Sequence, residues 1–225
     1  MTVEYCVISI GALSHNRLWS EAAPLRTSHA TTTLVTDGDR RILVDPSLPA
    51  VILGARFNER TGMMPDQVTD VFCTTLRPVH RRGIAAFPKA RWWCSETEQE
   101  WYGGRLRELA DSADRLKGEE LDAVQEDLKL LERFRPAPDR FGKQTEVFPL
   151  SGPSPGGTGL LLTPSAQTVV IAGDAALTAR HVQEGQVWEH SEDAEAALES
   201  LRSIVEIADA VVPGHDNVMF SPGRW

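Results

Sequence analysis

Four polar residues of the types that bind metals or transfer protons follow apolar segments of the chain. Asp45 comes after "RILV", Asp174 after "VVIAG", His215 after "DAVVPG", and His80 after "VTDVFC" and a short loop. Imidazole nitrogens and carboxylate oxygens are ligands for Zn²⁺, Fe²⁺ and Mn²⁺. A single Asp after a strand is ordinarily a turn or cap residue, and a single His is ordinarily a hydrogen-bonded structural residue. Four such positions predict a shared site, because strand ends that converge in an open sheet are where sites are built.

The loop that carries His80 is rich in arginine. It reads "TTLRPVHRRG" from Thr74 to Gly83. A guanidinium group has a fixed positive charge and no lone pair, so Arg77 cannot bind a cation. Arg77 and Arg81 are instead candidates for binding a carboxylate or phosphate group of a small anionic molecule. The alternative for Arg81 is a solvated surface charge.

Runs of strands and helices alternate around these residues. A hairpin is expected from Thr31–Thr36 and Arg41–Val44, with a turn at Gly38. Further strands are expected in "VEYCVISIGAL", "QVTDVFCTT", "ARWWCS", "TEVFPL", "TGLLLTP", "TVVIAGDA" and "DAVVPGHD". The order strands, helix, strands, helix predicts two sheets covered by helices in a single domain of residues 1–225.

Three helical regions follow from the same patterns. A short helix is expected over about 48–58, with Ser47 as its N-cap and Gly62 as its stop. A charged helical insertion is expected at about 96–135, opened by a capping box of Ser95 and Glu98. Ser191 is interpreted as the N-cap of the last helix. The insertion is a candidate dimer surface or pocket lid, which makes a homodimer possible.

Composition limits the function classes. The net charge of −9 and the pI of about 5.2 argue against a general affinity for nucleic acid or an anionic membrane. No apolar run approaches the ~18–20 residues that span a bilayer, and the acidic N-terminal segment is unlike a signal peptide. The three cysteines show no paired spacing, which predicts buried free thiols and a cytoplasmic location.

Five segments together resemble the metallo-β-lactamase superfamily, most of all its small hydrolase-like members. They are "TTLVTDGDRRILVDPS", "VTDVFCTTLRPVHRRGIAAFPKARWWCSETE", "LSGPSPGGTGLLL", "VVIAGDAALT" and "ADAVVPGHD", in the family's order. The resemblance implies an α/β fold, the αββα sandwich, with the site at one edge of the two sheets.

The resemblance also assigns the metal positions, and most of them differ here. The family's Thr-His-x-His-x-Asp-His loop is matched by Thr74 to His80, so Thr75 and Arg77 replace two histidines and Val79 replaces an aspartate. Pro153 stands where a further histidine is expected. A site for two metals is therefore not expected.

The same resemblance matches the bridging aspartate with Asp174, the last histidine with His215, and a supporting aspartate with Asp45. Two states of the residual site follow from this set. In one, His80, Asp174 and His215 bind a single zinc, iron or manganese ion. In the other no metal binds, and Arg77 pairs with Asp174 so that a guanidinium replaces the lost cation.

Two hypotheses of function remain open. The chain is a non-catalytic or small-ligand-binding relative of metal-dependent hydrolases, in which Arg77, Arg81 and Asp174 bind the ligand. Alternatively, it is a hydrolase that uses one metal, or a metal-free acid/base site, on an ester, lactone or thioester.

Overall fold

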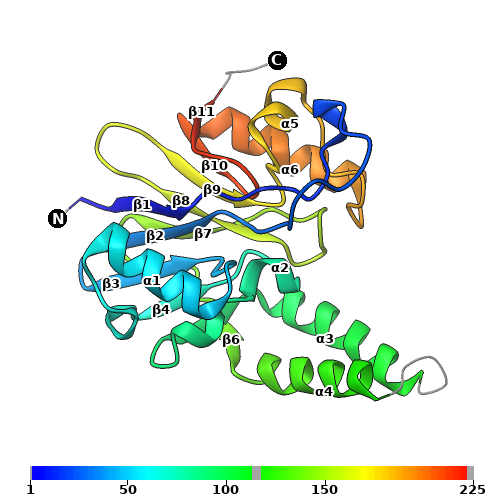
Figure 1. Cartoon of the computed structure of the whole chain (residues 1–225). Helices are drawn as coiled ribbons and strands as arrows, with labels where there is room; N and C mark the ends of the chain where they lie inside the picture. The colour runs from blue at the N-terminus through cyan, green and yellow to red at the C-terminus, as the bar shows by residue number, and fades with distance from the viewer. Residues whose placement is uncertain (1, 113–117, 222–225) are drawn as a thin grey trace.

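The computed structural model describes residues 2–112 and 118–221, and it forms two stacked sheets with helices on both outer faces (Figure 1). The first sheet has six strands in the order β1-β2-β3-β4-β5-β6. Its strands are β1 Glu4–Ser9, β2 Thr32–Asp37, β3 Arg40–Val44, β4 Asp70–Phe72, β5 Arg91–Cys94 and β6 Phe134–Pro136. The second sheet has five strands in the order β11-β10-β9-β8-β7. Its strands are β7 Thr145–Pro149, β8 Thr158–Leu162, β9 Val169–Gly173, β10 Ala210–Pro213 and β11 Met219–Phe220.

Three apolar clusters separate the four layers. Along β3, Ile42 and Val44 pack between the sheets, while Leu43 packs on the opposite face beneath the helices. In β9, Ile171 faces the other sheet and Val170 faces the helical layer. This alternation follows from the two-residue period of a strand, and it confirms the αββα sandwich predicted from the sequence.

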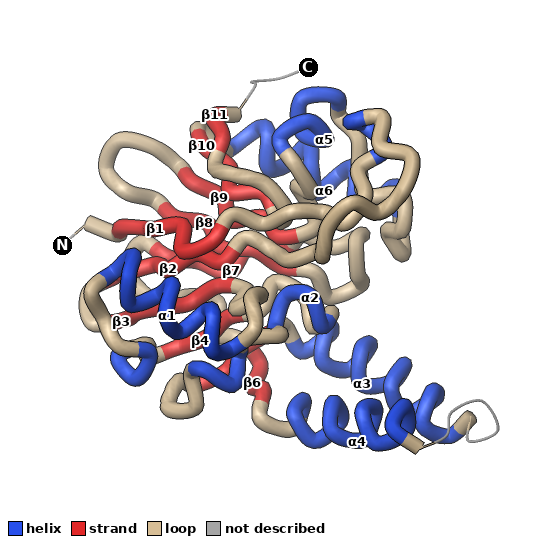
Figure 2. Tube along the Cα trace, in the orientation of Figure 1, coloured by secondary structure: helices blue, strands red, loops and turns tan. Residues whose placement is uncertain are grey.

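Helices cover both outer faces, as the coloured tube shows (Figure 2). They are α1 Ala50–Thr61, α2 Pro78–Arg81, α3 Glu96–Asp111, α4 Glu119–Leu131, α5 Ala179–Glu184 and α6 Ala194–Ile207. The described residues also form three short 3-10 helices, at η1 Arg17–Trp19, η2 Pro65–Gln67 and η3 Ile84–Ala86.

The helices differ from the expectations in their caps. The helix α1 has Pro49, not Ser47, at its N-cap position and therefore no side-chain cap, and the Ser47 hydroxyl instead donates to the Val79 carbonyl in the site loop. Gly62 ends α1 in the left-handed conformation, as predicted. Asp193, not Ser191, caps α6, because its carboxylate accepts from two backbone N–H groups of the first turn.

The charged segment after β5 forms a helical hairpin of α3 and α4 that projects from one end of the sandwich (Figure 1). The helix α4 ends at Leu131, short of the expected boundary, and the chain then adds Phe134–Pro136 to the sheet as the edge strand β6. A proline is tolerated there because an edge strand leaves one row of N–H groups unpaired.

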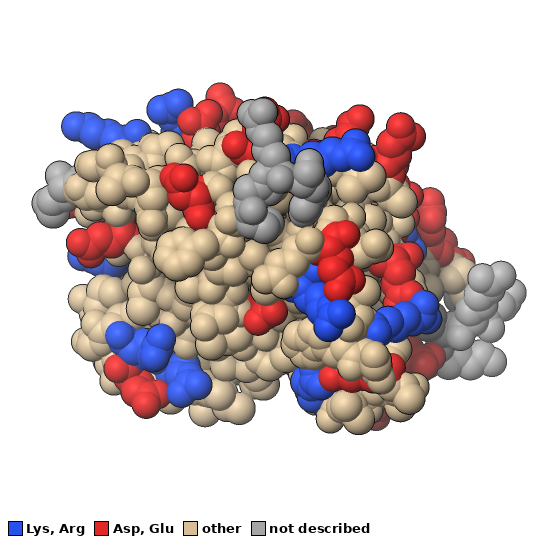
Figure 3. Space-filling view, turned by 90° about the horizontal axis from the view of Figure 1, so that it is seen from above, with Lys and Arg blue, Asp and Glu red and all other residues tan. Residues whose placement is uncertain are grey.

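Among the described residues, no helix is long and apolar enough to cross a membrane. Acidic and basic side chains are interspersed on the face seen in Figure 3, where the described residues present no continuous basic surface.

Candidate metal and ligand-binding site

Asp45 links the end of β3 to the loop that carries His80. It adopts a positive φ of 49°, a conformation that is uncommon for a residue other than glycine. One carboxylate oxygen accepts from the Thr74 backbone N–H at 2.9 Å, and the other accepts from the Thr74 hydroxyl at 2.7 Å. The second oxygen also lies 3.0 Å from Nδ1 of His80. Asp45 therefore fixes both the loop and the ring of His80.

Gly173 brings the second sheet against this loop. It has a φ of 53°, and a Cβ atom there would lie 2.4 Å from the Thr74 hydroxyl oxygen. Only glycine fits this close approach. As a result, Asp174 enters the site directly beside the loop of the first sheet.

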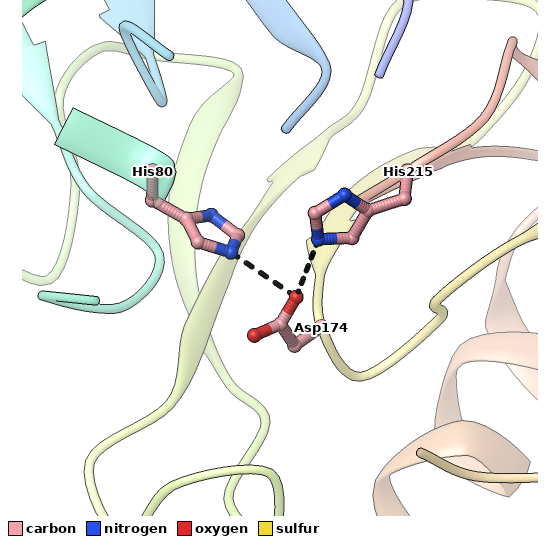
Figure 4. Close-up of side chains that lie close together, drawn as sticks. All are labelled: His80, Asp174 and His215. Carbon is pink, nitrogen blue, oxygen red and sulfur yellow. Dashed lines mark hydrogen bonds and ion pairs between the residues drawn. The ribbon is translucent and has the colours of Figure 1, made fainter. Parts of the chain in front are cut away.

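Asp174, His80 and His215 converge at one point (Figure 4). Oδ1 of Asp174 lies 3.1 Å from Nε2 of His80 and 3.2 Å from Nε2 of His215. Nδ1 of His215 lies 2.9 Å from the backbone carbonyl oxygen of His29. All three side chains are buried, and one ligand atom from each lies within 4.8 Å of the others.

The partners of the two imidazoles determine where their protons lie. A carbonyl oxygen can only accept, so Nδ1 of His215 donates to His29, and in the same way Nδ1 of His80 donates to Asp45. Both Nε2 atoms then face the same oxygen of Asp174. Such a contact is unfavourable unless a proton or a metal ion lies between the nitrogen and the oxygen. This arrangement also fixes ligand histidines in metal sites, where an acceptor holds the second ring nitrogen.

Without a metal, a proton supplies the positive charge. Burial lowers the pKa of His80, but the carboxylates of Asp174 and Asp45 outweigh burial and raise it to about 10. Burial raises the pKa of Asp174, but His80 and His215 outweigh burial and hold it well below its ordinary value. His80 is therefore an imidazolium between two carboxylates at neutral pH.

The other oxygen of Asp174 is bound by Arg77. One guanidinium nitrogen lies 3.1 Å from Oδ2 of Asp174, and another donates to the Pro153 carbonyl at 2.6 Å. The guanidinium also lies 4.6 Å from the ring centroid of Trp188 and 5.8 Å from that of Trp101. The contact between Arg77 and Asp174 is the one predicted from the sequence.

Glu98 binds the loop that carries Arg77, and it was not predicted as a site residue. One of its oxygens accepts from the Thr75 hydroxyl at 2.5 Å and from the Leu76 backbone N–H at 3.0 Å. The other accepts from the Ser154 hydroxyl at 2.6 Å. Its backbone N–H donates to Ser95, as expected of a capped helix, but its side chain does not complete the capping box. The glutamate three residues after the N-cap was the only signal in the sequence, and it was equally typical of a local cap.

The donors present fit one metal ion and do not fit two. His80, Asp174 and His215 offer two imidazoles and a carboxylate, and this is the one group of three or more such ligands among the described residues. On the Oδ2 side of Asp174 the neighbouring polar group is a guanidinium, which has no lone pair. The Thr75 hydroxyl there is bonded to Glu98.

Arg81 does not line the site. Its guanidinium makes two bonds to the Asp127 carboxylate on α4, at 2.6 and 2.5 Å, and its Nε donates to the Leu76 carbonyl. The side chain is only 4% exposed. It points away from the pocket because α4 supplies a bidentate acceptor, and this placement contradicts the expectation that it reaches the pocket mouth.

Two cavities meet at Arg77. A cavity of about 310 Å³ lies over Asp174 and His215, and a larger one of about 1050 Å³ lies against α3. Arg77 and Val79 line both of them. Arg77 is therefore accessible to a small molecule from either cavity, and 15% of its side chain is exposed.

Comparisons with known proteins agree with this architecture. A metallo-beta-lactamase-like protein of Thermotoga maritima superposes with a TM-score of 0.72 at 17% identity, covering 98% of this chain and 100% of that one. AidC, a dizinc quorum-quenching lactonase, gives a TM-score of 0.68 at 16% identity, covering 99% of this chain and 90% of that one. A quorum-quenching N-acyl homoserine lactone lactonase gives 0.62 at 19% identity, covering 91% and 87%. These likenesses establish the fold.

No curated protein sequence matches the chain. The family model described as the metallo-beta-lactamase superfamily matches residues 25–215, which include all the residues that converge on Asp174. The chain therefore belongs to the metallo-beta-lactamase superfamily.

Proposed function

We propose that this superfamily member has lost dinuclear hydrolysis and binds a small anionic molecule in the cavity over Asp174. The observation that carries the proposal is the contact of Arg77 with both Asp174 and the Pro153 carbonyl. By resemblance, Arg77 and Pro153 stand where two histidines would bind the first metal. A permanent guanidinium in that position replaces a cation that would otherwise neutralise Asp174.

The remaining donors of Arg77 favour an anionic ligand. A guanidinium has five N–H groups, and two of its nitrogens bond to Asp174 and Pro153. Arg77 also lines both cavities, which can admit a small molecule. A planar donor set of this kind binds carboxylate and phosphate groups with good geometry.

Calorimetry with butanoate and with inorganic phosphate tests this proposal. We expect binding to the wild type, loss of binding in Arg77→Gln, and unchanged binding in the control Arg56→Gln, which alters an exposed arginine on α1. Bound ligand should also raise the melting temperature of the wild type, since it binds the folded state alone. Equal binding to the wild type and Arg77→Gln would contradict the proposal.

A second candidate function is hydrolysis of an ester, lactone or thioester with one metal. The arrangement of His80 and His215 favours it, because acceptors hold both Nδ1 atoms and both Nε2 atoms face Asp174. These three residues would hold the ion, and a bound divalent ion supplies Lewis acidity and an acidified water. Asp45 would orient His80 through its Nδ1–H.

Metal content and hydrolysis of 4-nitrophenyl acetate decide between the two candidates. The hydrolase candidate predicts one metal per chain and activity that is lost with the metal in His215→Ala. Arg56→Gln is the control, because Arg56 is an exposed residue on α1 that lines neither cavity. Activity that survives both chelation and His215→Ala would contradict the single-metal candidate.

A further inference from the structure

Arg77 is held by two kinds of contact. At the edge of its guanidinium, one nitrogen lies 3.1 Å from Oδ2 of Asp174, and another donates to the Pro153 carbonyl at 2.6 Å. The guanidinium carbon also lies 4.6 Å from the ring centroid of Trp188, within the range of a cation–π interaction. Since the N–H groups of a guanidinium lie in its plane, an aromatic contact and hydrogen bonds at the edge are compatible.

Trp188 belongs to the segment between α5 and α6, which is joined to the other contact of Arg77. Asp193, the N-cap of α6, donates its backbone N–H to the Gly152 carbonyl at 3.0 Å. The next residue along the chain, Pro153, is the one whose carbonyl accepts from Arg77. The ring of Trp188 and the Pro153 carbonyl are therefore carried by backbone segments that are bonded to each other.

A turn inside this segment fixes the backbone of Trp188. The Ser191 backbone N–H and hydroxyl both donate to the Trp188 carbonyl, at 3.1 and 2.8 Å. Two exposed ion pairs tie the segment to η1 and to α3, Glu189 with Arg17 and Glu192 with Arg105. Ser191 therefore stabilises the turn that carries the indole.

A second indole, that of Trp101 on α3, lies farther from the guanidinium. Its ring centroid is 5.8 Å from the guanidinium carbon of Arg77 and 5.2 Å from that of Arg105. Trp101 lines the larger cavity against α3, whereas Trp188 lines the cavity over Asp174. Trp188 is therefore the nearer of the two indoles, and it shares the cavity proposed for the ligand.

We infer that Trp188 is the positioning residue for Arg77 in anion binding. Its ring lies against the guanidinium and keeps Arg77 ordered on Asp174 before the ligand arrives. An arginine side chain loses much rotamer freedom when it is fixed, and a donor ordered in advance loses less of it on binding. The inference rests on the proposed anion-binding function and adds a residue that sets the affinity of the ligand.

Butanoate affinity, measured by calorimetry, tests the inference in matched variants. Trp188→Leu keeps an apolar side chain but has no aromatic face, so we expect about tenfold weaker binding. Trp188→Phe keeps an aromatic face and should bind within about threefold of the wild type. Trp19→Leu is the control and should bind as the wild type does. Trp19 lies against Arg26 in a pair of the same kind and lines neither cavity.

A double-mutant cycle separates positioning from packing and needs no ligand. If the indole acts through Arg77, Trp188→Leu should change the unfolding equilibrium less in the Arg77→Gln background than in the wild type. We expect the two changes in the equilibrium constant to differ by about threefold to tenfold. An indole that only fills space would have the same effect in both backgrounds, because independent contributions add.

Unchanged butanoate affinity in Trp188→Leu, or equal weakening in Trp188→Leu and Trp188→Phe, would overturn the inference and leave the anion site intact. Equal effects of Trp188→Leu on unfolding in the two backgrounds would also overturn it, whatever the ligand binding shows. Absence of butanoate and phosphate binding to the wild type would overturn the proposed function, and the role of Trp188 in affinity with it.

Discussion

The two oxygens of Asp174 divide the site into halves that differ in kind. On the Oδ1 side, His80 and His215 present nitrogen atoms that become metal ligands when they are unprotonated. On the Oδ2 side, Arg77 supplies a fixed charge, and Glu98 bonds to the loop through Thr75. The two halves therefore differ in what they offer to one carboxylate: imidazole nitrogens on the Oδ1 side and a guanidinium on the Oδ2 side.

The buried network of Glu98 is the strongest test of the Oδ2 half. Glu98→Ala would leave the Thr75 hydroxyl, the Leu76 N–H and the Ser154 hydroxyl without their acceptor, so we expect a loss of about 3–5 kcal/mol in the free energy of unfolding. Chemical denaturation measures it. The exposed neighbour Glu100→Ala is the control, with an expected change below about 0.5 kcal/mol. Similar stabilities of the two variants would show that the hydrogen bonds of Glu98 do not stabilise this half of the site.

Arg77 tests the charge balance between the halves. Arg77→Ala leaves Asp174 without its guanidinium, and because the pair is largely buried we expect a loss of about 2–4 kcal/mol. Arg56→Ala should cost less than about 1 kcal/mol, since its ion pair is exposed. If denaturation midpoints of Arg77→Ala and wild type coincide, Arg77 does not neutralise Asp174 in solution.

The Oδ1 half should make the stability of the metal-free protein fall at alkaline pH. The folded-state pKa of His80 is raised from 6.5 to about 10, so its stabilisation is fully present below 6.5 and is lost as the pH rises toward 10. We expect the free energy of unfolding in EDTA to fall by about 3 kcal/mol between pH 6.5 and about pH 9. His80→Gln should show a flatter profile, and a wild-type profile just as flat would refute the imidazolium.

Asp127 tests whether Arg81 differs in role from Arg77. Asp127→Asn weakens the pair with Arg81, in which the carboxylate is partly exposed, so we expect a loss of about 1 kcal/mol. Butanoate binding should not change, because Arg81 faces α4 and not the cavity. A large loss of butanoate affinity in Asp127→Asn, with the fold intact, would return Arg81 to the list of ligand-binding residues.

The sequence predicted the architecture because its strands carry strong patterns. Alternating residues such as Ile42 and Leu43 specify two faces, and Gly38 and Gly62 mark turns at which the backbone is left-handed. The short edge strand β6 was missed, because Phe134 and Pro136 directly follow a helix and carry too few residues for a strand pattern.

The residues that converge on Asp174, Arg77 among them, could be predicted from their types and from the resemblance. His80, Asp174 and His215 met as expected. Arg81 and Glu98 did not follow their predicted roles, because their partners lie far away in the sequence, at Asp127 and Ser154. Local spacing contains no information on such partners.

We propose that only one half of the site can hold a metal. The most direct test is the metal content of the purified wild type after incubation with excess zinc and removal of loosely bound ions. We predict at most one zinc per chain, reduced further by His215→Ala. Arg77→His should not add a second ion, because Thr75 and Pro153 still provide no imidazole. Two tightly bound zinc ions per wild-type chain, both lost in Asp174→Ala, would contradict the account.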